Sequence, residues 1–204
     1  MGEPSRELIE SAAAHDPIAQ FAAWYDEACA VERPLPHAAA LATATRGGAP
    51  AVRMVLLKDF DAAGFVFYTN YQSRKGRELE NNNRACLLFH WGHLERQVRI
   101  EGRTVKVSAR ESDAYFATRP RGSQLSACAS PQSAVVVDRA QLESRYAAAT
   151  RRYPDEVRRP AHWGGYRLVP SALEFWQGRA DRLHDRLRYR RARDGRWIIE
   201  RLGP

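Results

Sequence analysis

Basic and hydroxyl residues gather in three short strings of the sequence, at positions 53–58, 68–70 and 73–75. In a meander of antiparallel strands the ends of these strings can converge. A phosphate would then meet both charge-assisted and hydroxyl donors. The alternative interpretation is a set of ordinary solvated cations on strand edges. The strings alone leave both interpretations open.

A second group lies at positions 115–124. Arg119 and Arg121 flank a proline, and Gly122 and Ser123 follow. This order favours a rigid loop that offers guanidinium, hydroxyl and backbone N–H groups to an anion. The same residues could instead form a helix C-terminus with favourable dipole interactions.

A third group reads Arg-Leu-His-Asp-Arg at positions 182–186. In an extended segment, alternation places Arg182, His184 and Arg186 on one face, which forms a polar wall unless that face is solvent. A cationic histidine is disfavoured between two arginines. We therefore expect a neutral His184 that can serve as a hydrogen-bonding group.

Other chemistries have weak support. His90 and His93 could suggest a metal, but no nearby pair of cysteines or carboxylates completes a shell, so we expect no metal site. The three cysteines are far apart and odd in number, which excludes a disulfide framework. The common nucleotide and hydrolase fingerprints are absent.

The charge and length limit the class of protein. A chain of 204 residues fits one domain, and its net charge of +8 indicates an anionic partner. That partner could be nucleic acid, a membrane surface or a phosphorylated small molecule. Residues 186–191 are basic and aromatic and could touch RNA, but nearby aspartates favour a solvated strand edge. No stretch approaches the roughly 20 apolar residues of a membrane span, and no secretory signal is evident, so we expect a cytoplasmic protein.

The elements that must position these residues are mostly short strands. Asp16 and Pro17 begin a helix that ends before Pro34. Apolar or alternating runs then predict strands at 38–45, 51–58, 64–70, 84–89, 97–107, 165–168, 173–177, 187–191 and 197–201. Residues 73–80 predict a short helix, and capping patterns at Ser108 and Asp138 predict two more. The fold class is α+β, mainly antiparallel β, as a barrel with a few inserted helices.

Ten strings along the chain resemble the pyridoxamine 5′-phosphate oxidase family in order and spacing. They lie at 53–58, 67–70, 73–75, 94–97, 119–124, 131–133, 163–165, 175–178, 182–186 and 201–204. The resemblance runs from about Phe21 to the C-terminus. It implies an FMN-binding split β-barrel over residues 1–204, with 1–16 as a flexible N-terminal arm, and a homodimer with FMN at the interface. A family pattern of Arg-x-x-Tyr in that arm is absent here.

The resemblance also implies roles for individual residues. FMN would be held by residues that match Arg53, Met54, Val55, Leu56, Lys58, Tyr68, Thr69, Arg74, Lys75, Gln97, Gln132, Ser133, Trp176 and Arg186. The substrate would be held by those matching Lys58, Tyr115, Arg119, Ser123, Arg182 and His184. Arg182 and His184 are the expected catalytic residues, beside the pyridine ring.

The implied reaction is oxidation of pyridoxamine or pyridoxine 5′-phosphate by O₂, giving pyridoxal 5′-phosphate and hydrogen peroxide. FMN does the redox chemistry, and the protein supplies orientation and charge. A related flavin oxidase that acts on another aromatic substrate, as in phenazine biosynthesis, is the nearest alternative. A flavin-binding or nucleic-acid-binding module without turnover is a second. The presence of both the flavin and the substrate residues favours the phosphorylated vitamer over nucleic acid or membrane.

Overall fold

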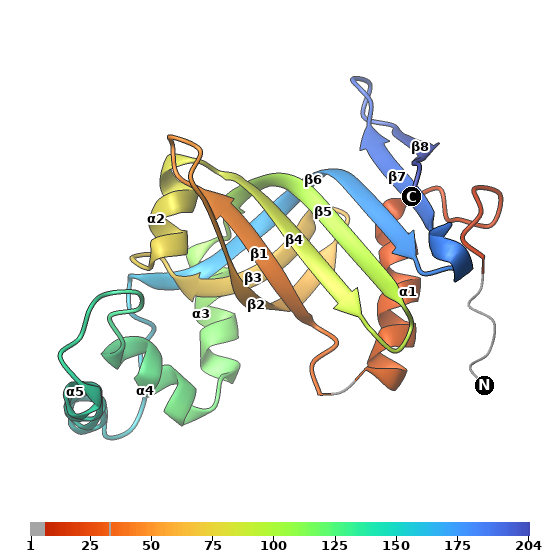
Figure 1. Ribbon diagram of the computed structural model, residues 1–204. Helices are drawn as coiled ribbons and strands as arrows, with labels where there is room; N and C mark the ends of the chain where they lie inside the picture. Colours follow the sequence, from red (N-terminus) through yellow and green to blue (C-terminus); the bar gives the residue numbers. More distant parts are fainter. Residues whose placement is uncertain (1–6, 33) are drawn as a thin grey trace.

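The computed structural model describes residues 7–32 and 34–204, and its centre is an antiparallel β-barrel (Figure 1). The strands are β1 Ala38–Ala44, β2 Pro50–Asp61, β3 Gly64–Asn70, β4 Arg84–Trp91, β5 Arg96–Lys106, β6 Trp163–Gln177, β7 Asp185–Arg191 and β8 Trp197–Arg201. The helices are α1 Pro17–Val31, α2 Arg74–Asn81, α3 Ala109–Thr118, α4 Arg121–Ala129, α5 Arg139–Arg152 and the short 3₁₀ turn η1 Ala180–Arg182.

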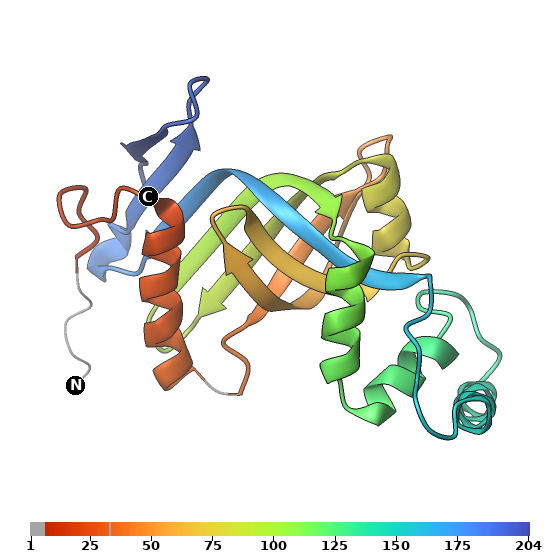
Figure 2. The ribbon, with the colours of Figure 1, turned by 180° about the vertical axis from the view of Figure 1, so that it is seen from behind.

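The barrel closes because β3 pairs with β6 as well as with β2. The sheet order is β3-β2-β1-β4-β5-β6-β7-β8, and the additional β3–β6 pairing joins the first six into a ring. The predicted barrel with inserted helices is therefore confirmed. Strands β7 and β8 continue the sheet beyond the ring. Figures 1 and 2 show this hairpin at one end of the barrel and helices α3 to α5 at the other.

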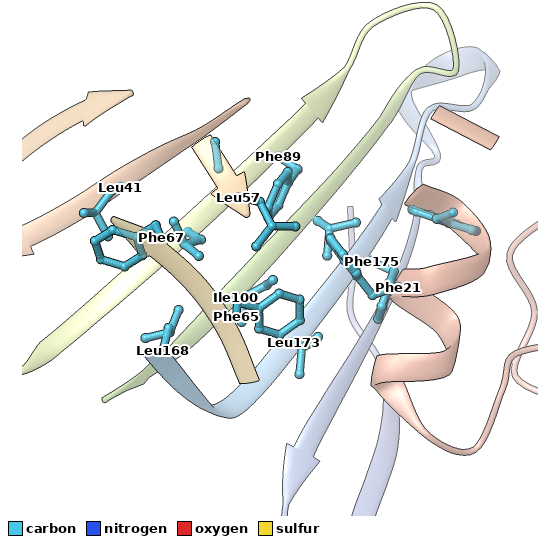
Figure 3. Packing of buried hydrophobic residues seen from close by; sticks show 14 of the residues in the cluster. Phe21, Leu41, Leu57, Phe65, Phe67, Phe89, Ile100, Leu168, Leu173 and Phe175 are labelled. Carbon is cyan, nitrogen blue, oxygen red and sulfur yellow. The ribbon is translucent and has the colours of Figure 1, made fainter. Parts of the chain in front are cut away.

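The barrel interior holds the main core, and α1 covers one opening. Alternating strand residues such as Leu41, Phe67 and Ile100 point inward, where Figure 3 shows them packed together. Phe21 of α1 is fully buried and its ring lies 4.9 Å from that of Phe65. The helix begins where predicted, because the Asp16 side chain accepts a hydrogen bond from the Ile18 N–H at 3.0 Å.

The capping patterns also place two helices correctly. The Ser108 hydroxyl accepts from the Glu111 N–H at 3.0 Å at the start of α3. The Asp138 carboxylate accepts from the Gln141 N–H at 2.7 Å at the start of α5. Each cap satisfies a backbone donor that has no partner within its own helix.

Helix α4 corrects a prediction, since residues 119–124 are not a rigid loop. Pro120 precedes the first turn, and the helix runs from Arg121 to Ala129. Its Leu125 is buried in a second apolar cluster with Phe116 and Trp163. Burial of that leucine stabilises a helix that the proline and glycine obscure in the sequence.

The predicted strands at 165–168 and 173–177 are one strand, β6. Pro170 lies between the pairing with β3, which ends at Leu168, and the pairing with β7, which begins at Ala172. Proline lacks the N–H that a neighbouring strand would need as a donor. On the edge of β6 that pairs with β3 and then with β7, no described strand pairs with Pro170. The strand therefore continues through the proline.

The predicted N-terminal arm covers residues 1–16, of which 1–6 lie outside the described residues. From Glu7 onward the chain contacts the β7–β8 hairpin. Leu8 is 6% exposed and belongs to the main core. Its N–H donates to Asp185 at 3.3 Å, and the Tyr189 hydroxyl donates to the Ala14 carbonyl at 2.7 Å. The sequence did not indicate these contacts.

Within the described ranges, no helix has the length and apolar composition needed to cross a membrane.

Candidate functional site

A cavity of about 480 Å³ lies between the barrel and helices α2, α3 and α4. Eleven of the residues proposed from sequence line it: Met54, Val55, Leu56, Lys58, Tyr68, Thr69, Lys75, Tyr115, Arg119, Ser123 and Gln132. Thr118, Pro120 and Trp163 complete the lining. Residues that are far apart in the sequence, from Met54 to Trp163, therefore line one cavity.

The open side of β2 forms one wall. Strand β1 pairs with β2 from Pro50 to Leu56, but β3 pairs with β2 only from Leu57 onward. Among the described strands, none pairs with the second edge of β2 between Pro50 and Leu56. Backbone N–H and C=O groups beside Met54 and Leu56 are thus available to a ligand.

Among the described residues, the lining contains three cations, Lys58, Lys75 and Arg119, and no carboxylate. The Nη1 atom of Arg119 is buried and has no hydrogen-bond partner, while its guanidinium lies 4.6 Å from the Trp163 ring. Burial lowers the pKa of Arg119, and partial burial together with the Arg119 charge lowers the pKa of Lys58. An anion would supply the missing partner and relieve this repulsion.

Lys75 faces the same space from the first turn of α2. The Ser73 side chain caps this helix by accepting from the Gly76 N–H at 3.2 Å. The Lys75 ammonium donates to Thr69 at 3.2 Å and to Gln132 at 2.9 Å. Burial and the nearby Arg53 charge lower the pKa of Lys75 to about 8. The amine and the Thr69 hydroxyl both donate to the Gln132 amide oxygen, so the three groups form a compact polar cluster.

Arg53 and Arg74 lie behind this cluster and share one buried carboxylate. Glu78, which is 5% exposed, accepts from Arg53 at 3.0 Å and from Arg74 at 2.8 Å. The Thr43 hydroxyl donates to the same carboxylate at 2.5 Å. Neither arginine lines the cavity. Sequence reasoning missed Glu78, because the pairing depends on strand β1 lying next to α2.

Three aromatic rings form another part of the lining. Tyr68 stacks on Tyr115 with ring centroids 4.0 Å apart, and on Trp163 at 5.4 Å. Burial raises the pKa of Tyr68 to about 12, so its hydroxyl keeps its proton and can donate. Trp163 was given no role from sequence, although it belongs to one of the strings that carried the resemblance.

The remaining predicted residues lie elsewhere. Gln97, Trp176 and Arg186 occupy one row across β5, β6 and β7, where each pairs with the next. Arg186 donates to Glu174 through two nitrogens, at 2.8 and 2.7 Å. Ser133 is exposed, with φ of 70°, in the loop after Gln132.

Arg182 and His184 also lie at the far end, and not on one extended face as predicted. The turn η1 lies between β6 and β7, and its residues Asp181 and Arg182 have φ of 55° and 60°. His184 accepts from the Arg179 N–H at 3.2 Å, and its ring lies 4.5 Å from that of Trp176. Backbone geometry at Asp181 therefore decides where Arg182 points, and strand alternation does not.

The two sets of residues are far apart within one chain. Trp163 lines the cavity at the start of β6, and Trp176 lies near its end. Thirteen residues at ~3.3 Å each give a path of about 40 Å along the strand. The cavity and the Arg182–His184 turn therefore do not meet within one copy of the chain.

The described residues hold no cluster of three or more histidine, cysteine or acidic side chains that could bind a metal.

Comparison with known proteins identifies the family. Residues 25–152 match the family described as pyridoxamine 5′-phosphate oxidase, and residues 163–204 match the pyridoxine 5′-phosphate oxidase C-terminal dimerisation region. The pyridoxine/pyridoxamine 5′-phosphate oxidase of Herminiimonas arsenicoxydans is 55% identical over 97% of this chain and 94% of its own length. The protein of the same name from Cupriavidus pinatubonensis is 57% identical over 97% of this chain and 93% of its own.

Solved structures of similar proteins have the same fold. PhzG from Burkholderia lata 383, in complex with tetrahydrophenazine-1-carboxylic acid, superposes with a TM-score of 0.93 at 33% identity and full coverage of both chains. A pyridoxamine 5′-phosphate oxidase-related, FMN-binding protein from Nostoc punctiforme shares the fold, with a TM-score of 0.75 at 17% identity over 94% of this chain and all of its own. The chain belongs to the pyridoxamine 5′-phosphate oxidase family, and its cofactor is FMN.

Proposed function

We propose that the protein oxidises pyridoxamine 5′-phosphate, pyridoxine 5′-phosphate or both to pyridoxal 5′-phosphate, with O₂ as the electron acceptor. The observation that carries the proposal is the buried, unpartnered Nη1 of Arg119 beside Lys58 in a cavity without carboxylates. A phosphate monoester supplies the charge and the acceptor oxygens that these cations lack. Relatives more than half identical to the chain carry this activity in their names.

The donor set fits FMN as well as the substrate. Lys75, Thr69 and Gln132 already form a cluster suited to the flavin phosphate, with Arg53 and Arg74 behind it. The unpaired edge of β2 beside Met54 and Leu56 suits the polar edge of the flavin ring. Lys58, Tyr115, Arg119 and Ser123 then remain for the phosphate of the substrate.

The active unit in this proposal is a homodimer with FMN at the interface. Residues 163–204 match a dimerisation region, and they include Trp176, Arg182, His184 and Arg186. The outward face of β2 is apolar, since Val52 and Met54 are 69% and 63% exposed. A second copy would cover that face and bring its Arg182–His184 turn to the cavity of the first. Each site then needs both subunits.

When bound, FMN would supply the redox chemistry, as the acceptor of a hydride from C4′ and the donor of two electrons to O₂, which with the proton released by the substrate gives hydrogen peroxide. Lys58 and Arg119 hold the substrate phosphate and so fix the distance of C4′ from the flavin. Arg182 and His184 contact the pyridine ring from the partner copy. The aromatic wall of Tyr68, Tyr115 and Trp163 limits water on one side of the cavity. An amine substrate leaves an imine, which water hydrolyses.

A second candidate substrate is an aromatic carboxylic acid. PhzG, whose fold is so similar, was solved with tetrahydrophenazine-1-carboxylic acid, and a carboxylate could also meet Arg119. The identity to PhzG is 33%, against 55% and 57% for the pyridoxine/pyridoxamine 5′-phosphate oxidases. The sequence similarity therefore favours the phosphorylated vitamer.

The test is anaerobic addition of pyridoxamine 5′-phosphate, and separately of pyridoxine 5′-phosphate, to the FMN-loaded protein, with the flavin absorbance followed before and after air is admitted. We expect bleaching, formation of pyridoxal 5′-phosphate and recovery of the yellow colour in air. Pyridoxamine and pyridoxine without their phosphates are the matched controls, and they should bleach the flavin far more slowly. A flavin that stays oxidised with both vitamers but bleaches with a dihydrophenazine carboxylic acid would overturn the proposal in favour of the second candidate.

A further inference from the structure

The loop that carries Arg182 and His184 has a constrained backbone. Asp181 and Arg182 are consecutive and both lie in the left-handed region, with φ of 55° and 60°. Residues other than glycine adopt this region only where their surroundings hold them there. Within the loop, the Leu183 N–H donates to the Ala180 carbonyl at 3.1 Å. A single turn of this kind does not hold such a conformation, so contacts at the base of the loop must contribute.

Asp185 closes the base of the loop. Its carboxylate, with 17% of the side chain exposed, accepts from Arg201 at 2.8 Å and lies 3.7 Å from the Nε of Arg179. Arg179 precedes the loop and Asp185 follows it. The Arg179 N–H also donates to His184 at 3.2 Å. The two ends of the loop are therefore joined by the Arg179–Asp185 pair, and neither of these two side chains is assigned to the substrate.

The N-terminal arm completes this base. The Leu8 N–H donates to Asp185 at 3.3 Å, and Arg201 donates to the Leu8 carbonyl at 2.9 Å. Arg201 also binds both carboxylate oxygens of Glu10, each at 2.8 Å, and Glu7 pairs with Arg179 at 2.9 Å. These ion pairs lower the pKa of Glu10 to about 2 and raise the pKa of Arg201. Arm and loop base form one connected network.

We propose that Asp185, Arg201 and the arm at Leu8 and Glu10 act as a clamp that positions Arg182 and His184. Asp185 is a positioning residue, since it acts through the loop. The substrate part of this inference rests on the proposed function. Residues 7–10 thereby acquire a role in the site, although they lie at the opposite end of the chain from the loop.

The decisive variant is Asp185→Asn, which keeps the shape of the side chain but weakens its pairing with Arg179 and Arg201. Glu200→Gln is the matched control, because Glu200 also pairs with two arginines of the same hairpin but does not contact the loop base. In the FMN-loaded protein we expect Asp185→Asn to raise KM for the vitamer about tenfold or more, while the FMN dissociation constant changes less than about twofold. Glu200→Gln should alter neither.

A second readout needs no substrate. Hydrogen exchange of a peptide spanning residues 179–185 should be faster in Asp185→Asn than in the wild type or in Glu200→Gln. Glu10→Gln tests the arm separately and should give a smaller change of the same kind, which also covers the case that Asp185→Asn does not fold. Unchanged exchange in both Asp185→Asn and Glu10→Gln would overturn the clamp. Equal increases in KM and in the FMN dissociation constant would overturn it too, because the effect would then be global.

The exchange experiment also separates this inference from the proposed function. If the wild type fails to oxidise either vitamer, the substrate assignment is wrong. The exchange rates of residues 179–185 still decide whether the clamp holds the loop.

Discussion

Two basic regions of the molecule differ in how their charges are balanced. In the β7–β8 hairpin, Arg186, Arg188, Arg190 and Arg201 each pair with a carboxylate. In the cavity, Lys58, Lys75 and Arg119 form no ion pair with any described residue. The consequence appears in the pKa values: carboxylate partners raise that of Arg201, whereas burial lowers that of Arg119.

This difference separates cations that pair with carboxylates from cations that have no carboxylate partner among the described residues and that we propose bind phosphate. A paired arginine is already neutralised, and its partners orient it. A buried cation without a partner is unfavourable in the folded chain, and an anion that binds there removes the penalty. A count of the cations alone would not distinguish the two regions, since both are basic.

The largest expected effect comes from exchanging one arginine in each region. Arg119→Gln should lower kcat/KM for the vitamer about 100-fold, because the phosphate loses a charged donor. The melting temperature of the FMN-free protein should change little, because removal of a buried cation with an unpartnered Nη1 offsets loss of the contact with the Trp163 ring. Arg201→Gln should lower that melting temperature, because Glu10 and Asp185 both lose the arginine that pairs with them. Steady-state kinetics and thermal unfolding check both. A fall in the melting temperature of the Arg119→Gln protein as large as that of Arg201→Gln would contradict the difference between the two regions.

A mixed dimer tests whether the two regions belong to the same site. Arg119→Gln and His184→Ala should each be nearly inactive alone. When they are co-expressed, half the dimers are mixed and one of their two sites has only wild-type residues, so about a quarter of wild-type activity should return. Two different tags, one on each variant subunit, allow the mixed dimers to be isolated by two successive purifications and then assayed. No recovery in isolated mixed dimers would mean that the site does not combine residues from two chains.

The cavity should also respond to pH where the hairpin does not. Lys75 has a pKa of about 8 in the free chain, and a bound phosphate raises it. FMN affinity is therefore full below pH 8 and weakens as pH rises above it, by at most about tenfold per pH unit. Fluorescence titrations of FMN between neutral pH and alkaline pH give the curve. Lys75→Arg should flatten it, and a pH-dependent Lys75→Arg protein would assign the effect to another group.

The smallest effect is expected for the ion pairs that Glu200 forms on the surface of the hairpin. Glu200 accepts from Arg188 and Arg190, and these contacts lower its pKa. Exposed pairs contribute little, because solvent screens them and side-chain entropy opposes them. Glu200→Gln should leave the melting temperature and kcat/KM unchanged. A clear loss of activity would show that the hairpin takes part in the site through more than its positioning contacts.

Local patterns in the sequence were enough for most elements of the fold. The caps at Asp16, Ser108 and Asp138 lie within three residues of the groups they satisfy, so the sequence alone indicates where those helices begin. Alternation likewise indicates the barrel strands. The errors occur where a distant contact decides the local structure. Helix α4 depends on burial of Leu125, and β6 passes Pro170 because β3 has ended there and β7 has not begun.

For the candidate site, the sequence determined which residue types are available: a cluster of cations and hydroxyls at 53–75, a second at 115–123 and a polar group at 182–186. It did not determine which of these meet. The hydrogen bonds from Thr43 to Glu78 and from Leu8 to Asp185 join residues 35 and 177 positions apart. Such pairs form only when the barrel closes and brings distant strands and the arm together. The tertiary structure therefore decided which cations are paired and which are left for a ligand, because pairing depends on distance in space and not on spacing along the chain.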